Sequence, residues 1–310
     1  MRFVRLRRQW LRRGRRWQIR WRAWRLPEHA EWPLPPSSPF IAGLSPEQQQ
    51  RAIAEVCRAI GAAPRGEIHS GIKRTAISTR LLQPDGSEAW LKMTLQGGVK
   101  ERWRRQGERL AQVLDVPQPK ILREHEWTQD GQAMHAFVYS LASPSVQLTP
   151  WVSSRLPPLS DEWIDRLKSA LAHVAAQPIT RWTMPPGNIA RSIAQRFGRR
   201  APYEIDEWRM SHGDLHWSNL SAPDLSLLDW EFFGAAPRGY DAATLLIFAM
   251  RKRELYRRLE AAFADDLNTR SGIVARLLAI ARRMGGIEAG KSDPRDYAAL
   301  EREAKRLMRM

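Results

Sequence analysis

Apolar and polar positions along the first half of the chain alternate in patterns that predict one helix, a group of strands and a second helix. The first helix begins after Ser45, a residue type that caps helices, and ends at Gly61. Strand-like alternation follows over 67–95, with a tight turn at 84–87. Residues 99–114 return to helical spacing, which predicts the second helix.

The second half of the chain has a mostly helical pattern. A turn at 130–131 and a buried-looking strand over 136–140 precede it. From residue 160 onward, apolar faces at helical spacing predict helices over 163–174 and 189–197. Three further helices are predicted over 240–264, 273–284 and 294–308. Strands therefore concentrate in the first half and helices in the second.

Length and composition limit the classes of protein to which this chain can belong. With 310 residues, the chain can hold one large domain or two lobes with an ample core. Its 43 % hydrophobic content is typical of a soluble globular protein, and no apolar run approaches the roughly 20 residues of a membrane-spanning helix. Cys57 is the only cysteine, so there is no internal disulfide framework and nothing points to secretion. We expect a cytoplasmic protein.

Much of the positive charge lies in an N-terminal tail. The net charge is +17, but residues 1–26 contain eleven Arg and no acid, which leaves +6 for the rest of the chain. Arginine alternates with tryptophan in this tail, a pattern that suits weak binding to anionic lipid or to RNA. Like-charge repulsion favours the plainer interpretation of a disordered basic tail, or of a translation start placed too far upstream. A Pro-rich stretch over 33–40 then predicts an extended linker.

One stretch, 210–234, carries the residues best suited to chemistry. Its sequence is MSHGDLHWSNLSAPDLSLLDWEFFG, in which His212, Asp214 and Asn219 have the spacing His-x-Asp-x4-Asn and Asp229 ends an apolar run. An acid and an amide five residues apart on a tight loop can reach one bound phosphate from two sides. A second acid, carried back by a short hairpin, can complete a metal shell. This is the minimum set for phosphoryl transfer, in which positioning and charge neutralisation supply nearly all the catalysis.

The same stretch resembles the aminoglycoside phosphotransferase and choline kinase-like families, which are small-molecule relatives of protein kinases. HGDLHWSN is similar to their catalytic loop, and LLDWE is similar to the strand that ends in the metal-binding Asp. The resemblance implies that Asp214 is the catalytic base and that Asn219 and Asp229 hold Mg2+. His212 is the second candidate catalytic residue, although a histidine in such a loop more often packs and hydrogen-bonds the turn than transfers protons.

The resemblance also implies a nucleotide site in the first half of the chain. Lys92 lies inside an apolar strand, where its charge needs a partner. In kinase-like folds that partner is the α- and β-phosphates together with a helix Glu. Glu101 and Glu108 are the nearby acids, and either could face inward or the pair could be absent; we favour Glu108. A loop that begins with Ser70 and Gly71 could cover the nucleotide phosphates, although an ordinary hairpin tip would look the same.

The implied fold is α+β and two-lobed like that of protein kinases, with a small antiparallel-sheet N-lobe and a larger, mostly helical C-lobe. The expected divisions are a tail and linker over 1–40, an N-lobe over 41–142 and a C-lobe over 143–310. The implied activity is phosphoryl transfer from ATP or GTP, with Mg2+, to a hydroxyl of a small molecule such as an aminoglycoside, a sugar or a related metabolite. The alternatives are a kinase-like binding protein without turnover, and a membrane- or RNA-associated protein acting through its tail.

The distribution of charge bears on the choice of acceptor. Aminoglycosides are polycations and usually call for an acidic pocket. Residues 251–310 hold fifteen Lys or Arg and nine Asp or Glu, so this region has no acidic excess. The composition therefore favours a neutral or anionic acceptor, although a few well-placed acids would outweigh the net charge.

Overall fold

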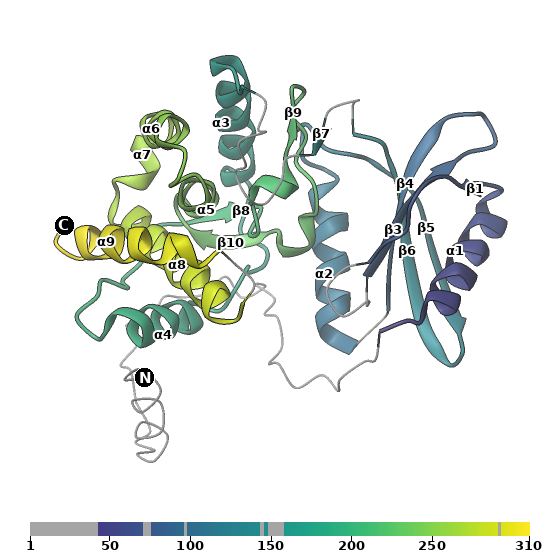
Figure 1. Cartoon of the computed structure of the whole chain (residues 1–310), viewed down its shortest axis with the longest axis horizontal. Coiled ribbons are helices and arrows are strands. Elements are labelled where there is room, and N and C mark those ends of the chain that lie inside the picture. The colour runs from purple at the N-terminus through teal and green to yellow at the C-terminus, as the bar shows by residue number, and fades with distance from the viewer. Residues whose placement is uncertain (1–42, 71–75, 96–97, 143–145, 148–157, 291–292) are drawn as a thin grey trace, which may run out of the picture.

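The computed structural model describes residues 43–70, 76–95, 98–142, 146–147, 158–290 and 293–310. The basic tail and linker predicted within residues 1–40 lie outside these ranges, so the predicted binding of anionic lipid or RNA stays a prediction. The described residues form an N-lobe built on an antiparallel sheet and a mostly helical C-lobe (Figure 1). The α+β, two-lobed architecture predicted from the sequence is confirmed.

The elements divide between the lobes as the sequence pattern predicts. The helices are α1 (Pro46–Ile60), α2 (Gly98–Ala111), α3 (Asp161–Ala175), α4 (Pro186–Phe197), α5 (Tyr240–Phe248), α6 (Arg253–Ala262), α7 (Ala264–Leu267), α8 (Arg270–Glu288) and α9 (Tyr297–Leu307), with short 3-10 helices η3 (Trp217–Asn219), η4 (Trp230–Phe232) and η5 (Pro294–Asp296). The strands are β1 (Ala63–Pro64), β2 (His69–Ser70), β3 (Ala76–Leu82), β4 (Glu88–Leu95), β5 (Ile121–Gln129), β6 (Gln132–Ser140), β7 (Val146–Gln147), β8 (Trp208–Ser211), β9 (Ser221–Ala222) and β10 (Gly234–Pro237). Among the helices of the described residues, none is both long and apolar enough to cross a bilayer.

The two faces of the N-lobe sheet have different partners. Its strands run in the order β1-β3-β4-β6-β5, with β2 paired to β3, and all the pairings are antiparallel. Because side chains alternate between the faces of a strand, Leu91 and Met93 of β4 turn one way and Lys92 turns the other. Leu91 and Met93 form an apolar core with α1, whose Ser45 cap and Gly61 end are those that the sequence predicts. Lys92 is left on the face that meets α2 (Figure 1).

Helix α2 lies between the N-lobe sheet and the C-lobe (Figure 1). Ala111 at its C-terminal end, with Leu114 and Val116 just beyond, belongs to the apolar core of the C-lobe. On the same helix, the ring of Trp103 lies 3.7 Å from the guanidinium of Arg181, which also donates a 2.8 Å hydrogen bond to the Trp103 carbonyl. The C-terminal end of α2 therefore joins the apolar core of the C-lobe, while the helix also lies against the N-lobe sheet.

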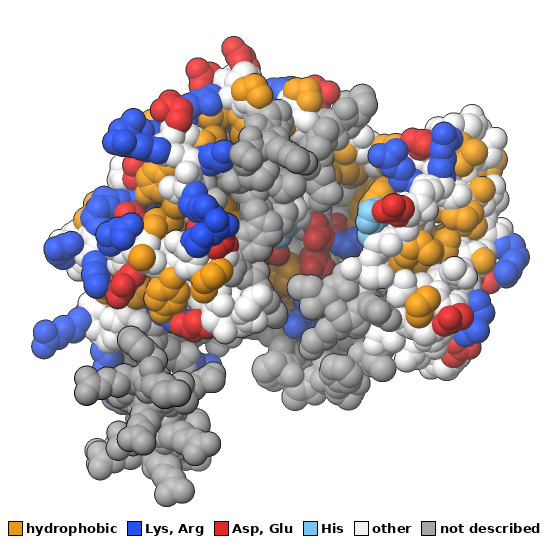
Figure 2. Space-filling view, viewed as in Figure 1, with side chains coloured by type: hydrophobic (Ala, Val, Ile, Leu, Met, Phe, Trp, Pro, Cys, Tyr) orange, Lys and Arg blue, Asp and Glu red, His pale blue; other side chains and the backbone are white. Residues whose placement is uncertain are grey.

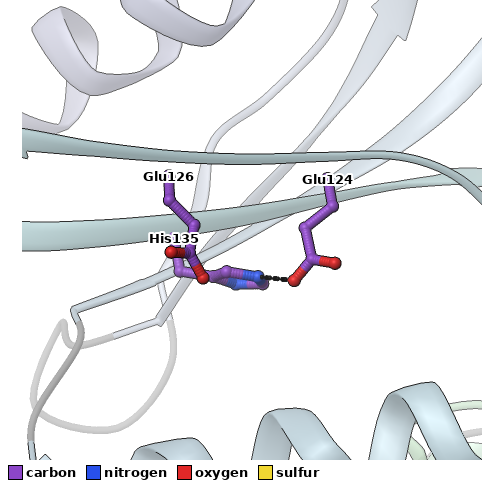
Figure 3. Close-up of side chains that lie close together, drawn as sticks. All are labelled: Glu124, Glu126 and His135. Carbon is purple, nitrogen blue, oxygen red and sulfur yellow. Dashed lines mark hydrogen bonds and ion pairs between the residues drawn. The ribbon is translucent and has the colours of Figure 1, made fainter.

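Charged side chains of β5 hold α2 from the sheet side. Arg109 of α2 pairs with Glu124 and lies 3.7 Å from Glu126. His135 is 1 % exposed, and its Nε2 atom lies 2.5 Å from Glu124. Figure 3 shows Glu124, Glu126 and His135 turned toward one another. Because Arg109 of α2 pairs with Glu124 and also lies near Glu126, we interpret this group as an ion-pair network that fixes the helix carrying Glu108 against the sheet.

The C-lobe packs α3, the helix that the sequence predicts over 163–174, behind the central stretch. The indole nitrogen of Trp163 on α3 donates a 3.0 Å hydrogen bond to the carbonyl of Ser221, and its ring stacks on Trp217 at a centroid distance of 6.4 Å. Strands β8 and β10, which flank the stretch, pair antiparallel. Between them, Leu220 and Leu227 form an antiparallel bridge, which closes the short hairpin that the sequence implies.

One predicted helix is wrong in its extent. The stretch 240–264 does not form a single helix, because α5 ends at Phe248 and α6 begins at Arg253. Helix α5 is buried on almost all sides. Continuing it would bring the basic residues 251–253 into the core, where charges are costly. The break instead lets the chain reach the surface, where α6 buries Leu259.

Candidate active site

Side chains from both lobes converge on Lys92. The Lys92 ammonium, on β4 of the N-lobe, lies 2.7 Å from Oε1 of Glu108 on α2. It also pairs with Oδ1 of Asp229, which comes from the C-lobe. The predicted strand lysine, helix glutamate and metal-binding acid are thus brought together. The other nearby acid, Glu101, instead pairs with Arg104 at 3.2 Å.

A close approach between α2 and the C-lobe permits this convergence. Gly107 lies against the backbone of η4, where a Cβ atom would stand 2.8 Å from the carbonyl oxygen of Trp230 and 2.9 Å from that of Glu231. A residue with a side chain would have to push the two segments apart. One position further along α2, Oε2 of Glu108 accepts a 3.3 Å hydrogen bond from the backbone N–H of Trp230. The glycine therefore lets the adjacent glutamate reach the segment that follows Asp229.

The backbone of Asp229 adopts an uncommon conformation. Its φ of 67° and ψ of 65° lie in the left-handed region, which residues with a side chain rarely occupy. Backbone strain of this kind costs on the order of 1 kcal/mol and clusters at functional sites. The Asp229 side chain is 39 % exposed, whereas that of Glu108 is 4 % exposed. The turn therefore presents the Asp229 carboxylate to solvent at the end of the apolar run.

Several carboxylates surround the single ammonium of Lys92. Burial works against the charge of Lys92, but the carboxylates of Asp229, Glu108 and Glu231 outweigh it and raise the Lys92 pKa well above its ordinary value. Burial would raise the pKa of Asp229, yet the attraction of Lys92 outweighs it and lowers that pKa. Burial raises the pKa of Glu231 to about 7. The charge of Lys92 acts to lower this pKa, and the charge of Asp229 acts to raise it further. Asp229 and Glu108 place two carboxylates on the one ammonium of Lys92, while Glu231 also lies 3.9 Å from Arg104. Two carboxylates beside one lysine suit a divalent cation bound through oxygen atoms.

Asn219 and Asp229 offer the oxygen atoms that Mg2+ prefers in proteins. The amide nitrogen of Asn219 donates a 2.9 Å hydrogen bond to the carbonyl of Asp214, so its amide oxygen is the atom that could hold a metal. The backbone carbonyl of Asn219 accepts from the N–H of Leu228 at 2.9 Å. This second bond ties Asn219 to the residue just before Asp229. The two candidate ligands therefore belong to one hydrogen-bonded unit.

His212 lies beneath the HGDLHWSN loop, residues 212–219. Its side chain is 0 % exposed, and its ring N–H at Nε2 donates a 2.9 Å hydrogen bond to the carbonyl of Leu228. Burial lowers the pKa of His212 to about 4, so the imidazole is neutral near pH 7. The ring also lies 4.5 Å from that of Trp230. These contacts hold the loop in place, and a catalytic role for His212 stays a prediction.

Asp241 anchors the start of the same loop from α5. Its carboxylate accepts hydrogen bonds from the backbone N–H groups of His212 at 2.7 Å and Gly213 at 3.0 Å. Burial raises the pKa of Asp241 to about 6, although both hydrogen bonds act to lower it. Gly213 has a φ of +87°, and a Cβ atom there would stand 2.2 Å from the carbonyl oxygen of Phe232. The loop therefore needs a glycine before Asp214.

Asp214 projects from the loop with its side chain 31 % exposed. Two basic side chains lie near its carboxylate. Nε2 of His216 is 3.9 Å from one oxygen, and a guanidinium nitrogen of Arg282 is 3.7 Å from the other. Nδ1 of His216 in turn lies 2.9 Å from the hydroxyl of Ser218. The accessible carboxylate is thus positioned where an incoming hydroxyl group could meet it.

Ser70 lies apart from these residues. Its hydroxyl donates a 3.1 Å hydrogen bond to Gln49 of α1. It pairs in register with the core residue Ile77, so its side chain is on the sheet face opposite to Lys92. Gly71 lies outside the described residues. The predicted contacts of Ser70 and Gly71 with the nucleotide phosphates therefore stay a prediction.

Three residues of the site have no role in the sequence-based prediction. Glu231 adds negative charge beside Lys92, and its place in Asp-Trp-Glu is a signal that could have found it. Asp241 stands at the start of GYDAATLL, which resembles the helix that follows the metal-binding Asp in the same families, but the sequence gives it no role. Arg282 lies on α8, far along the chain, and no local spacing links it to Asp214.

Figure 2 shows the surface hollowed between the N-lobe and the C-lobe, with acidic and basic side chains visible inside. Lys92 keeps 21 % of its side chain exposed, and Asp229 keeps 39 %. A ligand could therefore reach this charged group from solvent.

Comparisons with known proteins agree with the fold. No family model matches the chain, and no curated protein matches it in sequence. The structure is similar to that of an amicoumacin kinase in complex with AMP-PNP and Ca2+, with a TM-score of 0.51 and 12 % identity over 84 % of this chain and 92 % of that one. It is also similar to the apoenzyme of a macrolide 2′-phosphotransferase from Brachybacterium faecium, with a TM-score of 0.52 and 17 % identity over 82 % of this chain and 97 % of that one. The chain therefore has the fold of small-molecule kinases.

Proposed function

We propose that the protein transfers the γ-phosphate of ATP or GTP to a hydroxyl group of a small molecule, with Mg2+. The observation that carries the proposal is the convergence of Lys92, Glu108 and Asp229 from separate parts of the fold. Phosphoryl transfer depends on this combination of a cation for the phosphates and an acid for the metal. The structures of similar fold support the proposal, because one is a macrolide phosphotransferase and the other a kinase bound to an ATP analogue.

In the N-lobe, Lys92 would hold the α- and β-phosphates. Its ammonium already lies 2.7 Å from Glu108, which orients the side chain. The negative charge of the arriving phosphates would replace the carboxylate of Asp229 as a partner for the Lys92 ammonium. A dependence on ATP or GTP agrees with the cytoplasmic location expected from the sequence.

In the C-lobe, Asp214 would meet the acceptor hydroxyl. The hydroxyl oxygen forms a bond to the γ-phosphorus while the bond from that phosphorus to the β,γ-bridging oxygen breaks. The nucleoside diphosphate leaves with the electron pair of the broken bond, and the hydroxyl proton passes to Asp214. His212 and Asp241 would keep the loop in place while this happens, through the hydrogen bonds already described.

Asn219 and Asp229 would hold Mg2+, which when bound would neutralise negative charge on the phosphates. The excess of carboxylates around Lys92 supports this assignment. Ca2+ in the complex of the amicoumacin kinase shows that a protein of this fold takes a divalent cation.

The test is a screen of candidate acceptors with γ-labelled ATP and GTP, in parallel on the parent protein and on Lys92→Met. The parent should transfer label to at least one acceptor, and Lys92→Met should bind nucleotide more weakly and lose most of its turnover. Lys168→Met, which removes an exposed lysine on α3, is the matched control and should behave like the parent. Nucleotide binding without transfer would instead indicate a kinase-like binding protein. An unchanged nucleotide KM and kcat in Lys92→Met would remove Lys92 from the site.

A further inference from the structure

Arg282 is a cation on the acceptor side of the site. It lies on α8, and one of its guanidinium nitrogens is 3.7 Å from Oδ1 of Asp214. The other terminal nitrogen donates to the hydroxyl of Tyr240, which is 2 % exposed at the start of α5. Tyr240 therefore anchors the guanidinium, while 39 % of the Arg282 side chain stays exposed.

The two buried arginines of α8 have acids of their own. Arg276 is 1 % exposed and pairs with Glu260 at 2.9 Å and Glu303 at 2.6 Å. Arg283 is 6 % exposed and pairs with Asp296 at 2.7 Å. These pairs are structural, because each arginine sits within hydrogen-bond distance of a matching carboxylate.

Arg282 differs from these arginines in its ion pairing. Within the described residues, the acid that pairs with it is Asp214, and the 3.7 Å separation is longer than a charge-assisted hydrogen bond. Asp214 is also the residue proposed to receive the acceptor hydroxyl. A guanidinium is charged at every accessible pH and offers a planar fork of donors that fits carboxylate or phosphate oxygens. The guanidinium of Arg282 can therefore donate hydrogen bonds to a ligand that is bound to Asp214.

We propose, on the basis of the phosphotransferase function above, that the acceptor is a hydroxylated anion whose carboxylate or phosphate binds Arg282. The reacting hydroxyl lies on Asp214 and the oxyanion on Arg282. Because each of these hydrogen bonds is about 3 Å long and the two side chains are adjacent, the two groups of the acceptor lie within a few bonds of each other. An acceptor with an ammonium group at the same position would be repelled by the guanidinium.

The first test compares acceptors of related structure that differ in charge. The panel is D-glucose, D-glucuronate, D-glucose 6-phosphate and D-glucosamine, together with glycerol, D-glycerate and sn-glycerol 3-phosphate. The measured quantity is the ratio of kcat/KM for each anionic member to that of its neutral parent compound. In the unaltered protein we expect this ratio to be about ten or more, the usual worth of a charge-assisted hydrogen bond. The carboxylate and phosphate members show which oxyanion is preferred.

The variants are Arg282→Gln, Arg282→Lys and the control Arg270→Gln. Arg282→Gln should bring the ratio close to one, and Arg282→Lys should retain part of it because the charge is kept while the planar fork is lost. Arg270 lies at the other end of α8, pairs with Glu204 and is 60 % exposed, so Arg270→Gln should keep the full ratio. A preference for neutral or cationic acceptors, or a ratio that survives in Arg282→Gln, would overturn the proposal. An equal loss of rate on neutral and anionic members would do so too, because it would show a role in the transfer step alone.

Binding provides a readout that does not depend on turnover. Saturation-transfer NMR on the protein saturated with Mg–AMP-PNP gives the Kd of D-glucuronate and of D-glucose. D-Glucuronate should bind about tenfold or more tightly than D-glucose in the unaltered protein and in Arg270→Gln, but not in Arg282→Gln. Absence of an anion preference in both turnover and binding overturns this inference. Absence of nucleotide binding and of any phosphoryl transfer would instead overturn the phosphotransferase function.

Discussion

The carboxylate of Glu108 accepts a 3.3 Å hydrogen bond from the backbone N–H of Trp230, which lies 122 residues later in the chain. Its other oxygen lies 2.7 Å from the ammonium of Lys92. One side chain of α2 therefore joins the strand that carries Lys92 to the turn that presents Asp229. Because Glu108 is 4 % exposed, both interactions are shielded from solvent and from screening by salt.

Replacing Glu108 by Gln should weaken nucleotide binding. The substitution keeps the size of the side chain but removes the charge that holds Lys92, leaving the ammonium paired with Asp229 alone. Charge-assisted hydrogen bonds contribute more than neutral ones, so the nucleotide Kd should rise about 10- to 100-fold. A fluorescent ATP analogue, titrated in the presence of Mg2+, gives this Kd directly.

The matched control is Glu101→Gln on the same helix. Glu101 pairs with Arg104 and is 24 % exposed, so its loss should leave the nucleotide Kd within about twofold of the parent, as for most partly exposed ion pairs. An equal effect of the two substitutions would show that the charge of α2 as a whole matters, and not the Glu108 side chain.

Replacing Gly107 by Ala should destabilise the protein, although alanine has the higher helix propensity. Alanine favours an exposed helix position over glycine by about 1 kcal/mol. At Gly107, however, the new methyl group would stand 2.8 Å from the carbonyl oxygen of Trp230. Overpacking of this kind costs about 1–3 kcal/mol. Urea unfolding should therefore show a lower midpoint, and the nucleotide Kd should rise because α2 is displaced.

Gly285→Ala on α8 is the comparison for this substitution. The nearest heavy atom to a Cβ atom at Gly285 is Nη2 of Arg196 at 3.9 Å, which is ordinary contact. This variant should be as stable as the parent or more stable by about 0.5–1 kcal/mol. If Gly107→Ala gave the same gain, the close approach of α2 to η4 would not be a constraint in solution.

The candidate site is predictable from sequence where its residues share one loop. The spacing of HGDLHWSN places Asp214 and Asn219 together, and the apolar run before Asp229 carries that acid to the same place. The choice between Glu101 and Glu108 is different, because the two acids are seven residues apart. Seven residues are about two helical turns, so both acids lie on nearly the same face of α2. Which acid meets Lys92 depends on the approach of Gly107 to η4, which is a tertiary contact.

Long-range packing also explains the other differences between sequence pattern and structure. Helical spacing continues through 240–264, but burial of α5 on almost all sides forces a break before its basic residues. Arg282 reaches Asp214 only because α8 packs against α5. The sequence near these residues predicts neither the break after α5 nor the contact between Arg282 and Asp214. Both depend on how the helices pack against one another.

The buried histidine should make stability depend on pH. The pKa of His212 is about 4 in the folded protein, below its ordinary value of 6.5, because burial disfavours the charged ring. As pH falls from about 6.5 to about 4, the unfolded chain binds a proton that the folded protein does not, so the free energy of unfolding decreases. The decrease should be on the order of 3 kcal/mol across that window.

The contribution of His212 is isolated by comparing the parent with His212→Gln. Urea unfolding of both proteins at several pH values between 4 and 7 gives their difference in stability. We expect this difference to narrow as pH falls, because only the parent carries the titrating ring. His173→Gln, at an exposed position of α3, should run parallel to the parent. A difference that stays constant with pH would mean that folding does not lower the pKa of His212.

The last prediction separates the two acids of the central stretch by the step in which each acts. Asp214 would contact the acceptor hydroxyl, so its work lies in the transfer of phosphate. Asp214→Asn is nearly isosteric and should keep the affinity for Mg–nucleotide, while kcat falls about 10²–10⁴-fold, the range for loss of a general base. Asp229 would ligate Mg2+, so Asp229→Asn should lose turnover and also the additional nucleotide affinity that Mg2+ provides.

Titrating a fluorescent ATP analogue with and without Mg2+ on both variants distinguishes these roles. In the parent and in Asp214→Asn, Mg2+ should tighten binding to a similar degree, whereas in Asp229→Asn it should have little effect. Loss of the Asp229 charge also removes one partner of Lys92, so the Mg2+-free Kd must be measured as the reference for each protein. If Mg2+ still tightens binding to Asp229→Asn as it does to the parent, Asp229 is not a metal ligand. If Asp214→Asn turns over a true acceptor at the parent rate, Asp214 is not the catalytic base, and the interpretation of HGDLHWSN as the catalytic loop fails.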